Sequence, residues 1–423
     1  MSVGRDRSLS EIFAPASVAV IGASGRSGSV GSALFRNILT SGFQGVVYPL
    51  NPNHPSVSGV RCYPTIAELP EVPDLGVVIV PAAKVPGVAR ELGRAGCKGL
   101  IVISAGFKEI GGAGRALEEK LRAEAERYRM SLVGPNCFGV LNTAPETSLN
   151  ATFSDDLPPR GNIAFVSQSG ALCAGILRYG ISERIGFSRF VSVGNRAGVD
   201  ENDLLHSLGQ DAATRVILLY VESLAEGRRF LEAALEVTEH KPVLVIKSGR
   251  SPAGERAAQS HTGSLARSGQ DRLYDALFEQ SGVLRIESIG ELFRASKVLA
   301  TGARLEGPHL AILTNSGGPG IVAADACARL GLDLPAPAKV VADALRAQLS
   351  PSAGLGNPID MTADAGASQY RDALRLLLAS PDINGAIVIA TPTGLLTGEA
   401  AAQAILEGRG TSSKPIAACL FGL

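Results

Sequence analysis

The chain has 423 residues, of which 45% are hydrophobic and 19% charged, as is typical of globular domains with sizeable cores. Its 40 basic residues balance its 40 acidic residues, tryptophan is absent, and aromatic residues make up 5%. This composition argues against a basic surface or a row of stacking rings for nucleic acid, and the length predicts about three domains.

The six cysteines are scattered along the chain, without a Cys-x-x-Cys pair or the spacing of a zinc site. Residues 1–13 lack the apolar core of a signal peptide, and no stretch approaches the roughly 18 consecutive apolar residues of a membrane span. We therefore expect a cytoplasmic protein with reduced thiols, no metal site and no membrane contact.

Short apolar runs rich in β-branched residues alternate with helical stretches along the whole chain. Continuous apolar runs indicate strands covered on both faces, and the alternation predicts an α/β fold of doubly wound parallel sheets. The first predicted set of strands comprises residues 17–23, 45–51, 75–82, 99–106 and 131–136. A second set comprises 162–170, 188–195, 216–222 and 242–249, and a third comprises 309–316, 386–393 and 415–420.

Turn-forming residues cluster at 142–160 and near 302–308. These clusters predict domains of residues 1–150, 151–303 and 304–423, each of ordinary domain size. Residues 417–423 resemble a buried strand that nothing in the sequence covers or extends. We therefore expect either that the third domain is cut short or that another chain completes it.

A glycine-rich loop, residues 21–31, joins the first predicted strand to a predicted helix at 32–40. Such a loop lets the backbone approach a phosphate that the helix N-terminus attracts, but many nucleotide-binding folds share it. An NAD-binding unit would normally end its second strand in Asp or Glu, whereas this strand ends in Asn51 and Pro52. Arg26 would suit a ligand with an additional phosphate, although a solvated arginine is the simpler interpretation.

Two further strand-to-helix turns contain a Ser-Gly entry, one in each of the later domains. Ser167, Gln168, Ser169 and Gly170 could hold a free or transferring phosphate through hydroxyls and backbone N–H groups, or could be an ordinary serine cap. Residues 314–320 repeat the pattern with two successive glycines. One such entry in every predicted domain exceeds what helix capping requires.

A single histidine, His261, lies among small and hydroxylated residues in the loop 259–266. A large neutral fraction of its imidazole is available near neutral pH as a nucleophile or base, and small neighbours leave room for a phosphate. If His261 accepts a phosphoryl group, it needs a carboxylate to orient its ring, and Glu222 ends an apolar strand of the same predicted domain. Without the histidine, such an acid would more often be a solvated or capping group.

These motifs resemble those of the NDP-forming acyl-CoA synthetases, which are relatives of succinyl-CoA synthetase. The resemblance extends over nearly the whole chain, and its specific parts are Gly-Pro-Asn-Cys at 134–137 and Ser-His-Thr-Gly-Ser-Leu-Ala at 260–266. It implies a Rossmann-like CoA-binding domain followed by two flavodoxin-like ligase domains. The activity that it implies interconverts acyl-CoA, ADP and phosphate with carboxylic acid, ATP and CoA.

The resemblance also assigns roles to individual residues. In the first domain it implies that one group surrounds the CoA phosphates, namely Gly22, Ser24, Arg26 and Gly28. A second group would line the adenine, ribose or pantetheine path, namely Asn51, Pro81, Ser104 and Asn136. In the ligase domains it implies that His261 is phosphorylated and that Glu222 holds its ring. Two opposed helix N-termini would hold the phosphate, one at Ser167–Gly170 and one at Gly317 and Gly318.

The chain departs from the family pattern at Arg267, where glycine is common, and it contains nothing like an ATP-grasp unit or a Walker A sequence. The resemblance therefore implies an α-type component, with ADP or ATP and Mg²⁺ bound by a partner subunit or domain in a hetero- or homo-oligomer. The expected substrates are a small carboxylic acid and its acyl-CoA.

Three alternatives remain open from the sequence. The chain could be a CoA-binding regulatory module of a larger acyltransferase-type protein, although a phosphate relay through His261 would have no use there. It could be an NAD(P)-dependent oxidoreductase, which Asn51 disfavours. Cys137 could be a thioester-forming nucleophile, but no histidine is near it in the sequence, so we favour a small residue lining a pocket.

Overall fold

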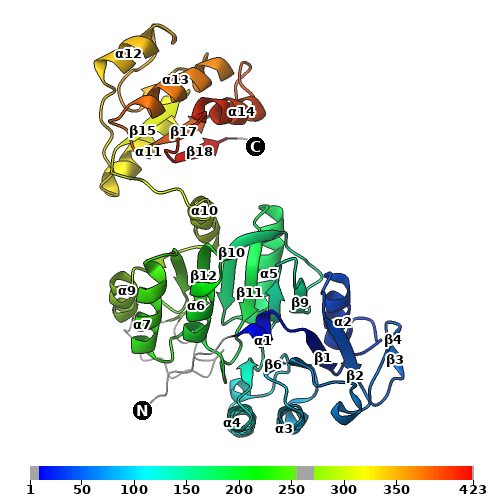
Figure 1. Cartoon of the computed structure of the whole chain (residues 1–423). Coiled ribbons are helices and arrows are strands. Elements are labelled where there is room, and N and C mark those ends of the chain that lie inside the picture. Colours follow the sequence, from blue (N-terminus) through cyan, green and yellow to red (C-terminus); the bar gives the residue numbers. More distant parts are fainter. Residues whose placement is uncertain (1–8, 252, 255–270, 422–423) are drawn as a thin grey trace. The chain divides into compact units, whose positions relative to one another are not determined.

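The computed structural model describes residues 9–251, 253–254 and 271–421. These residues form two compact units, residues 1–300 and 301–423 (Figure 1). The first unit contains two large sheets and a two-stranded hairpin, and the second unit contains one sheet.

The first sheet has five parallel strands in the order β2-β1-β5-β6-β7. Its strands are β1 (Ser17–Ile21), β2 (Val46–Leu50), β5 (Leu75–Val78), β6 (Gly99–Val102) and β7 (Ser131–Val133). Helix α2 (Val30–Thr40) packs on one face, and α3 (Val85–Ala95) and α4 (Gly112–Arg127) pack on the other. Both faces are therefore buried, as the continuous apolar runs predict.

Short elements complete this part of the chain. They are α1 (Ser10–Phe13), the hairpin of β3 (Ser56–Val57) and β4 (Val60–Arg61), and the 3₁₀ turns η1 (Ile66–Glu68), η2 (Ala82–Lys84) and η3 (Lys108–Ile110).

The second sheet has seven strands in the order β14-β13-β12-β10-β11-β8-β9. Five of them are parallel: β10 (Arg160–Ser167), β11 (Phe187–Ser192), β12 (Val216–Val221), β13 (Val243–Lys247) and β14 (Leu284–Arg285). Two antiparallel strands that the sequence patterns did not predict, β8 (Gly139–Asn142) and β9 (Leu149–Thr152), extend one edge.

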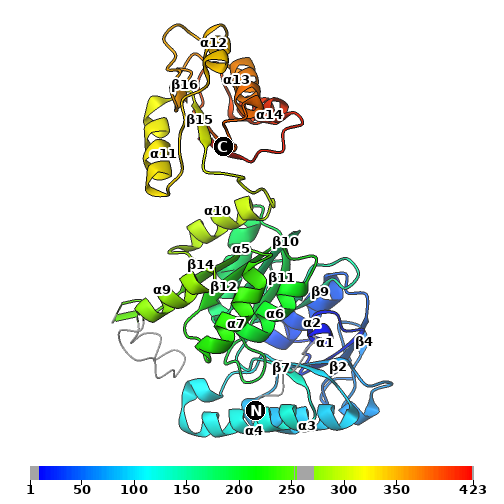
Figure 2. The same cartoon turned by 60° about the vertical axis from the view of Figure 1, so that its left-hand side comes forward.

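Helices cover both faces of the second sheet as well. One face carries α6 (Glu201–Gln210), α7 (Gly227–Thr238) and α9 (Asp271–Gln280), and the other carries α5 (Gly170–Ser182) and α10 (Ile289–Leu299). One hydrophobic cluster continues from the first sheet and α2 through β8 and β9 into the second sheet. The two sheets therefore share a core, and Figure 2 shows the same unit from a second direction.

The second unit has a four-stranded parallel sheet in the order β16-β15-β17-β18. Its strands are β15 (Leu310–Thr314), β16 (Ile359–Asp360), β17 (Gly385–Ala390) and β18 (Ile416–Leu420). Helices α12 (Lys339–Arg346), α13 (Ala367–Ala379) and α14 (Gly398–Arg409) contribute to the cluster on one face, and α11 (Gly317–Arg329) packs on the other.

All twelve strands predicted from the apolar runs are present, each within a few residues of its predicted bounds. The α/β class with parallel-sheet domains is confirmed. The boundaries at 150 and 303 stay predictions. Within the described part of the chain, no helix is long and apolar enough to cross a bilayer.

Candidate functional site

The glycine-rich loop after β1 is pressed against the neighbouring strand end. Gly22 has φ +96°, and a Cβ atom there would lie 2.4 Å from the carbonyl oxygen of Ile79. A Cβ atom on Gly31, in α2, would lie 2.3 Å from the carbonyl oxygen of Gly22. Gly25 and Gly28 have nothing within 4 Å of such an atom. The loop backbone is thus closely packed on the side of the sheet. At Gly25 and Gly28 it leaves space that a ligand could occupy.

Three polar residues of the predicted CoA site lie at the carboxyl ends of the strands of this sheet. Asn51 follows β2, and its Nδ2 donates to the carbonyl of Ala23 at 2.9 Å, so the side chain fixes the glycine-rich loop. Ser104 follows β6 and donates through Oγ to the carbonyl of Val80 at 2.5 Å. The backbone N–H of Asn136 donates to the carbonyl of Ser104 at 2.9 Å. Hydrogen bonds thus connect the segments that contain the predicted CoA contacts.

Pro81 immediately precedes η2, between β5 and α3. Ser24 accepts through Oγ from the backbone N–H of Arg26 at 3.1 Å, which stabilises the turn of the glycine-rich loop. Binding of CoA by these residues stays a prediction.

The turn after β10 forms the second candidate site. The Oγ atom of Ser169 caps α5 by accepting from the N–H of Leu172 at 3.4 Å. The hydroxyl of Ser167 donates to the carbonyl of Ser169 at 2.9 Å and accepts from its N–H at 3.0 Å. The serine cap expected as the simpler interpretation is therefore present. The turn also precedes the N-terminal N–H groups of a 13-residue helix, which can attract an anion.

Gln168 connects this turn to the end of β12. Its Oε1 accepts from the backbone N–H groups of Glu222 and Ser223, at 2.8 and 3.2 Å. Its Nε2 donates to the carbonyl of Ser223 at 2.9 Å. The predicted phosphate turn and the predicted carboxylate, 54 residues apart in sequence, are thus neighbours. The side chain of Gln168 is engaged in this connection, and its contact with phosphate stays a prediction.

Glu222 is 8% exposed and lies directly after β12. His261 lies outside the described residues, and so does Arg267. The interaction of His261 with Glu222 therefore stays a prediction.

The turn after β15 repeats the construction of the turn after β10. The hydroxyl of Thr314 donates to the carbonyl of Ser316 at 2.9 Å and accepts from its N–H at 3.0 Å, as Ser167 does with Ser169. Asn315 takes the place of Gln168, since its side-chain amide pairs with the N–H and carbonyl of Thr391, directly after β17, at 2.9 and 2.8 Å. The second sheet of the first unit and the sheet of the second unit therefore use one design to present a helix N-terminus.

Gly317 and Gly318 begin α11, which follows this second turn. A Cβ atom on Gly318 would meet nothing within 4 Å, and one on Gly317 would lie 3.0 Å from an oxygen of Asp360. The start of α11 is therefore open at Gly318 and lies beside the carboxylate of Asp360 at Gly317, and phosphate binding there stays a prediction.

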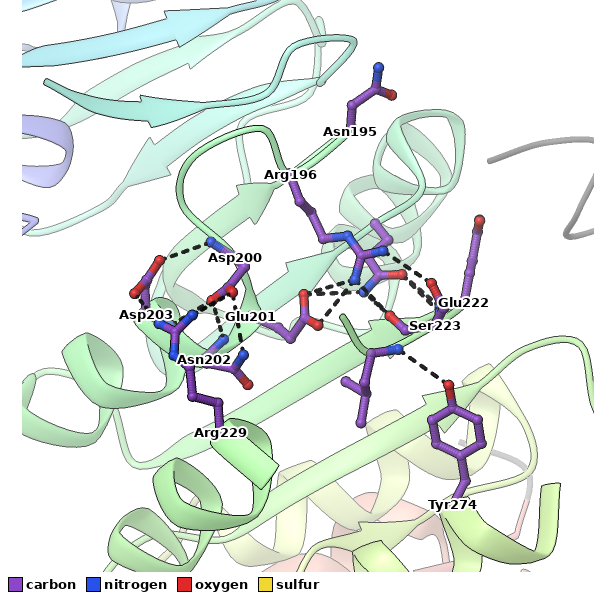
Figure 3. A network of polar contacts seen from close by, with 12 residues as sticks. Asn195, Arg196, Asp200, Glu201, Asn202, Asp203, Glu222, Ser223, Arg229 and Tyr274 are labelled. Atoms are coloured by element: carbon purple, nitrogen blue, oxygen red, sulfur yellow. Dashed lines mark hydrogen bonds and ion pairs between the residues drawn. The ribbon is translucent and has the colours of Figure 1, made fainter. Parts of the chain in front are cut away.

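Sequence reasoning missed two polar residues near Glu222, namely Arg196 and Glu201. Arg196, in the loop after β11, donates to both carboxylate oxygens of Glu201 at 3.1 and 3.2 Å and to the carbonyl of Ser223 at 2.7 Å (Figure 3). A second guanidinium nitrogen donates to the hydroxyl of Ser223 at 3.0 Å. Their only sequence signal is a pair of opposite charges five residues apart, which is common on surfaces.

The same loop also fixes the first sheet to the second. Asn195 donates through Nδ2 to carboxylate oxygens of Glu109 and Glu118, at 2.6 and 2.8 Å. Burial acts to raise the pKa of Glu109, but hydrogen bonds from Asn195 and from backbone N–H groups outweigh it and hold this pKa below its usual value. Burial lowers the pKa of Lys108, which forms an ion pair with Glu118 at 3.4 Å. The loops of the predicted CoA domain therefore have a fixed position beside the Glu222 site.

Cys137 is a buried thiol rather than an activated nucleophile. Its Sγ donates to the carbonyl of Val102 at 3.2 Å, and burial raises its pKa to about 12. Almost none of it is thiolate at neutral pH, which argues against a thioester role.

Comparison with known proteins assigns the chain to a class. Residues 16–143 match the model of a CoA binding domain, 160–299 that of a succinyl-CoA ligase like flavodoxin domain, and 310–422 that of a ligase-CoA domain. These matches identify a CoA-binding domain followed by two domains of the CoA-ligase type, and the last two contain the repeated helix-entry design.

Individual relatives give the family. The chain is 40% identical to the α subunit of acetate–CoA ligase [ADP-forming] I of Pyrococcus furiosus, over 98% of this chain and 90% of that subunit. It is 43% identical to acetate–CoA ligase [ADP-forming] I of Archaeoglobus fulgidus, over 94% of this chain but 57% of that enzyme. Its fold matches a dinucleotide forming acetyl-coenzyme A synthetase 1 of Ca. Korarchaeum cryptofilum, solved with phosphate and ADP, with a TM-score of 0.93, 39% identity and coverage of 98% and 89%.

The chain therefore belongs to the NDP-forming acyl-CoA synthetase family. Because these relatives are ligases and synthetases, the regulatory-module alternative is not favoured.

Proposed function

We propose that this chain is the α-type component of an NDP-forming acid–CoA ligase. Such an enzyme interconverts acyl-CoA, ADP and phosphate with a small carboxylic acid, ATP and CoA. One observation carries the proposal: Gln168 holds the start of α5 against the end of β12, so a helix N-terminus and Glu222 lie side by side. A phosphorylated histidine would find both a ring acceptor and a positive dipole end there.

The first step forms an acyl phosphate. A phosphate oxygen attacks the thioester carbonyl of acyl-CoA, a C–O bond forms, the C–S bond breaks, and CoA leaves as a thiolate that takes up a proton. N–H groups at the start of α5 would stabilise the phosphate charge, each such contact being worth up to about 2 kcal/mol.

In the second step a nitrogen of His261 attacks phosphorus. The P–N bond forms, the bond between phosphorus and the acyl oxygen breaks, and the carboxylate leaves. The carboxylate of Glu222 would accept a hydrogen bond from the N–H group of the ring. This bond would direct the other ring nitrogen towards phosphorus and stabilise the positive charge that the ring acquires.

The nucleotide step needs a second protein unit. An oxygen of ADP attacks the phosphohistidine, the P–N bond breaks, and ATP forms. Since the chain has no ATP-grasp sequence or Walker A motif, we propose that a partner subunit or domain binds ADP and Mg²⁺. The start of α11, at Gly317 and Gly318, would be the second phosphate-binding helix. We expect the assembly to work in the cytoplasm.

In the first domain the open side of the glycine-rich loop, at Arg26 and Gly28, would receive the CoA phosphates. Asn51, Pro81, Ser104 and Asn136 would direct the remainder of the cofactor towards the Glu222 site. The hydrogen bonds from Asn195 to Glu109 in η3 and to Glu118 in α4 support this route, because they connect the two sheets.

The test is incubation of the chain with acetyl-CoA and ³²P-labelled phosphate. We expect one equivalent of acid-labile label and one equivalent of free CoA thiol per chain, and neither in His261→Ala. His240→Ala is the control, because His240 is a surface residue next to α7. Release of CoA without label on the protein, or equal labelling of His261→Ala, contradicts the proposal.

A further inference from the structure

The three residues that follow β12 are held unusually firmly. Every polar backbone and hydroxyl atom of Ser223 has a partner: Gln168 binds its N–H and carbonyl, and Arg196 binds its carbonyl and hydroxyl. The N–H of Glu222 is bound by Gln168, and the N–H of Leu224 donates to the hydroxyl of Tyr274 at 3.3 Å. The peptide units on both sides of the Glu222 side chain therefore have little freedom to move.

Arg196, like Tyr274, belongs to this arrangement but lies outside the predicted phosphate turn. Arg196 reaches Ser223 from the loop after β11 (Figure 3). Gln168 reaches Ser223 from the turn before α5. Arg196 itself has φ +58°, a conformation that a non-glycine residue rarely adopts and that costs of order 1 kcal/mol or more. The loop thus accepts strain at the residue whose side chain binds Ser223.

Glu201 fixes the guanidinium of Arg196. Its side chain is 0% exposed, and its carboxylate also accepts from Nε2 of Gln168 at 3.3 Å. Burying an ion pair costs desolvation that its attraction roughly repays, so stability alone is a weak reason for such a pair. Geometry is a better reason. Arg196 and Gln168 are the two side chains that bind Ser223, and both donate hydrogen bonds to the carboxylate of Glu201.

We propose that Arg196, held by Glu201, is a positioning residue for phosphoryl transfer and acts by fixing Ser223 and hence the carboxylate of Glu222. This inference rests on the proposed function. Arg196 touches neither the acyl group nor the phosphate in this role. Its loss would leave the carboxylate in the site but free to shift, and a displacement of about 1 Å can cost about 100-fold in rate.

Arg229, on α7, provides a matched control. Arg229 also forms ion pairs at the start of α6, with Asp200 at 3.1 Å and Asp203 at 2.7 Å. In Figure 3 these three residues form a separate group from Arg196 and Ser223. Arg229→Gln therefore removes the ion pairs of a more exposed arginine without releasing the end of β12.

The test measures single-turnover phosphoenzyme formation by the full chain with acetyl-CoA and labelled phosphate. We expect Arg196→Gln to slow it by about 10- to 100-fold, with the acetyl-CoA concentration for half-maximal rate unchanged, and Arg229→Gln to slow it less than about twofold. Arg196→Lys keeps the charge beside Glu201 but cannot span two atoms of Ser223, so an intermediate loss is expected. If Arg196→Gln does not fold, Arg196→Lys carries the test alone.

A double-mutant cycle shows whether Arg196 acts through Glu222. In a Glu222→Gln background, adding Arg196→Gln should change the rate by less than about twofold, because the group that it positions is already lost. Equal slowing by Arg196→Gln in both backgrounds, or equal rates of Arg196→Gln and Arg229→Gln, overturns the inference and leaves the proposed function standing. Wild-type chain without any phosphoenzyme overturns both.

Hydrogen exchange gives an independent structural readout. We expect the amides of residues 222–224 to exchange faster in Arg196→Gln than in wild type, and at the wild-type rate in Arg229→Gln. Unchanged exchange of these amides in Arg196→Gln contradicts the positioning role, whatever the kinetics.

Discussion

Single side-chain amides replace backbone pairing at the end of two parallel strands. Gln168 binds a backbone N–H and a carbonyl of the residues that follow β12, and Asn315 does the same for the residue that follows β17. A buried N–H group without a partner costs about 1–3 kcal/mol, so these amides stabilise backbone that would otherwise need water. They also place the helix N-termini next to the strand ends, where ligands of open α/β sheets bind.

Cys137 provides a prediction at the residue scale. Cys137→Ala should retain acyl-CoA-dependent phosphoenzyme formation within about twofold, because the buried thiol is protonated at neutral pH. A loss of more than about tenfold, with the fold intact by circular dichroism, would restore the nucleophile interpretation.

The raised pKa of Cys137 also predicts a pH dependence of stability. Because its pKa in the folded chain lies above the ordinary thiol value, its contribution is fully present below pH 9.0 and is lost as the pH rises towards about 12. Urea unfolding should therefore show the free energy of unfolding falling more steeply above pH 9.0 in wild type than in Cys137→Ala. Parallel pH profiles contradict this account.

The sequence predicted the residues of the helix entries but not their connections. Ser167, Gly170, Gly317 and Glu222 could be found because turn chemistry and strand ends are local signals. The hydrogen bonds of Gln168 join residues 54 positions apart, and Arg196 looks like a surface charge until the fold brings it to Ser223. Such contacts depend on the order of strands in a sheet, which a local pattern does not contain.

At the scale of elements, the glycine-rich loop shows how a backbone conformation can be required by a neighbouring strand. Gly22→Ala should destabilise the first unit by roughly 2 kcal/mol or more, since it adds a Cβ atom to a residue at φ +96° and 2.4 Å from a carbonyl oxygen. Affinity for CoA in calorimetry should fall with it, because the loop must shift.

Gly25→Ala is the control for this prediction, because Gly25 has ordinary φ and open space around its Cβ position. It should leave the free energy of unfolding within experimental error. If Gly22→Ala and Gly25→Ala change the free energy of unfolding equally, the close contact of Gly22 with the end of β5 is not the reason for a glycine at that position.

Strands that lie inside a sheet were predicted well because their apolar runs are continuous, as in β10 and β12. The strands β8 and β9 were missed because each is four residues long, contains asparagine and lies in or next to a turn-rich stretch. Their place at the edge of the second sheet also explains how the chain passes from one sheet to the next through a shared core.

At the scale of the whole molecule, the chain combines a CoA-type domain with two ligase domains of similar construction. The CoA-type domain and the first ligase domain are joined by a continuous core and by the hydrogen bonds of Asn195 to Glu109 and Glu118. Residues 301–423 form a separate compact unit. In the proposed cycle, acyl transfer needs the firmly joined part, while transfer to a nucleotide needs a further unit that binds ADP.

The central claim is that one imidazole carries the phosphoryl group beside Glu222. Phosphorus-31 nuclear magnetic resonance of the chain incubated with acetyl-CoA and phosphate tests it most directly. The account predicts a phosphohistidine resonance that is missing in His261→Ala and disappears when acetate and CoA are added to wild type. A resonance of a phosphoserine, or a phosphohistidine that persists with acetate and CoA, would contradict it.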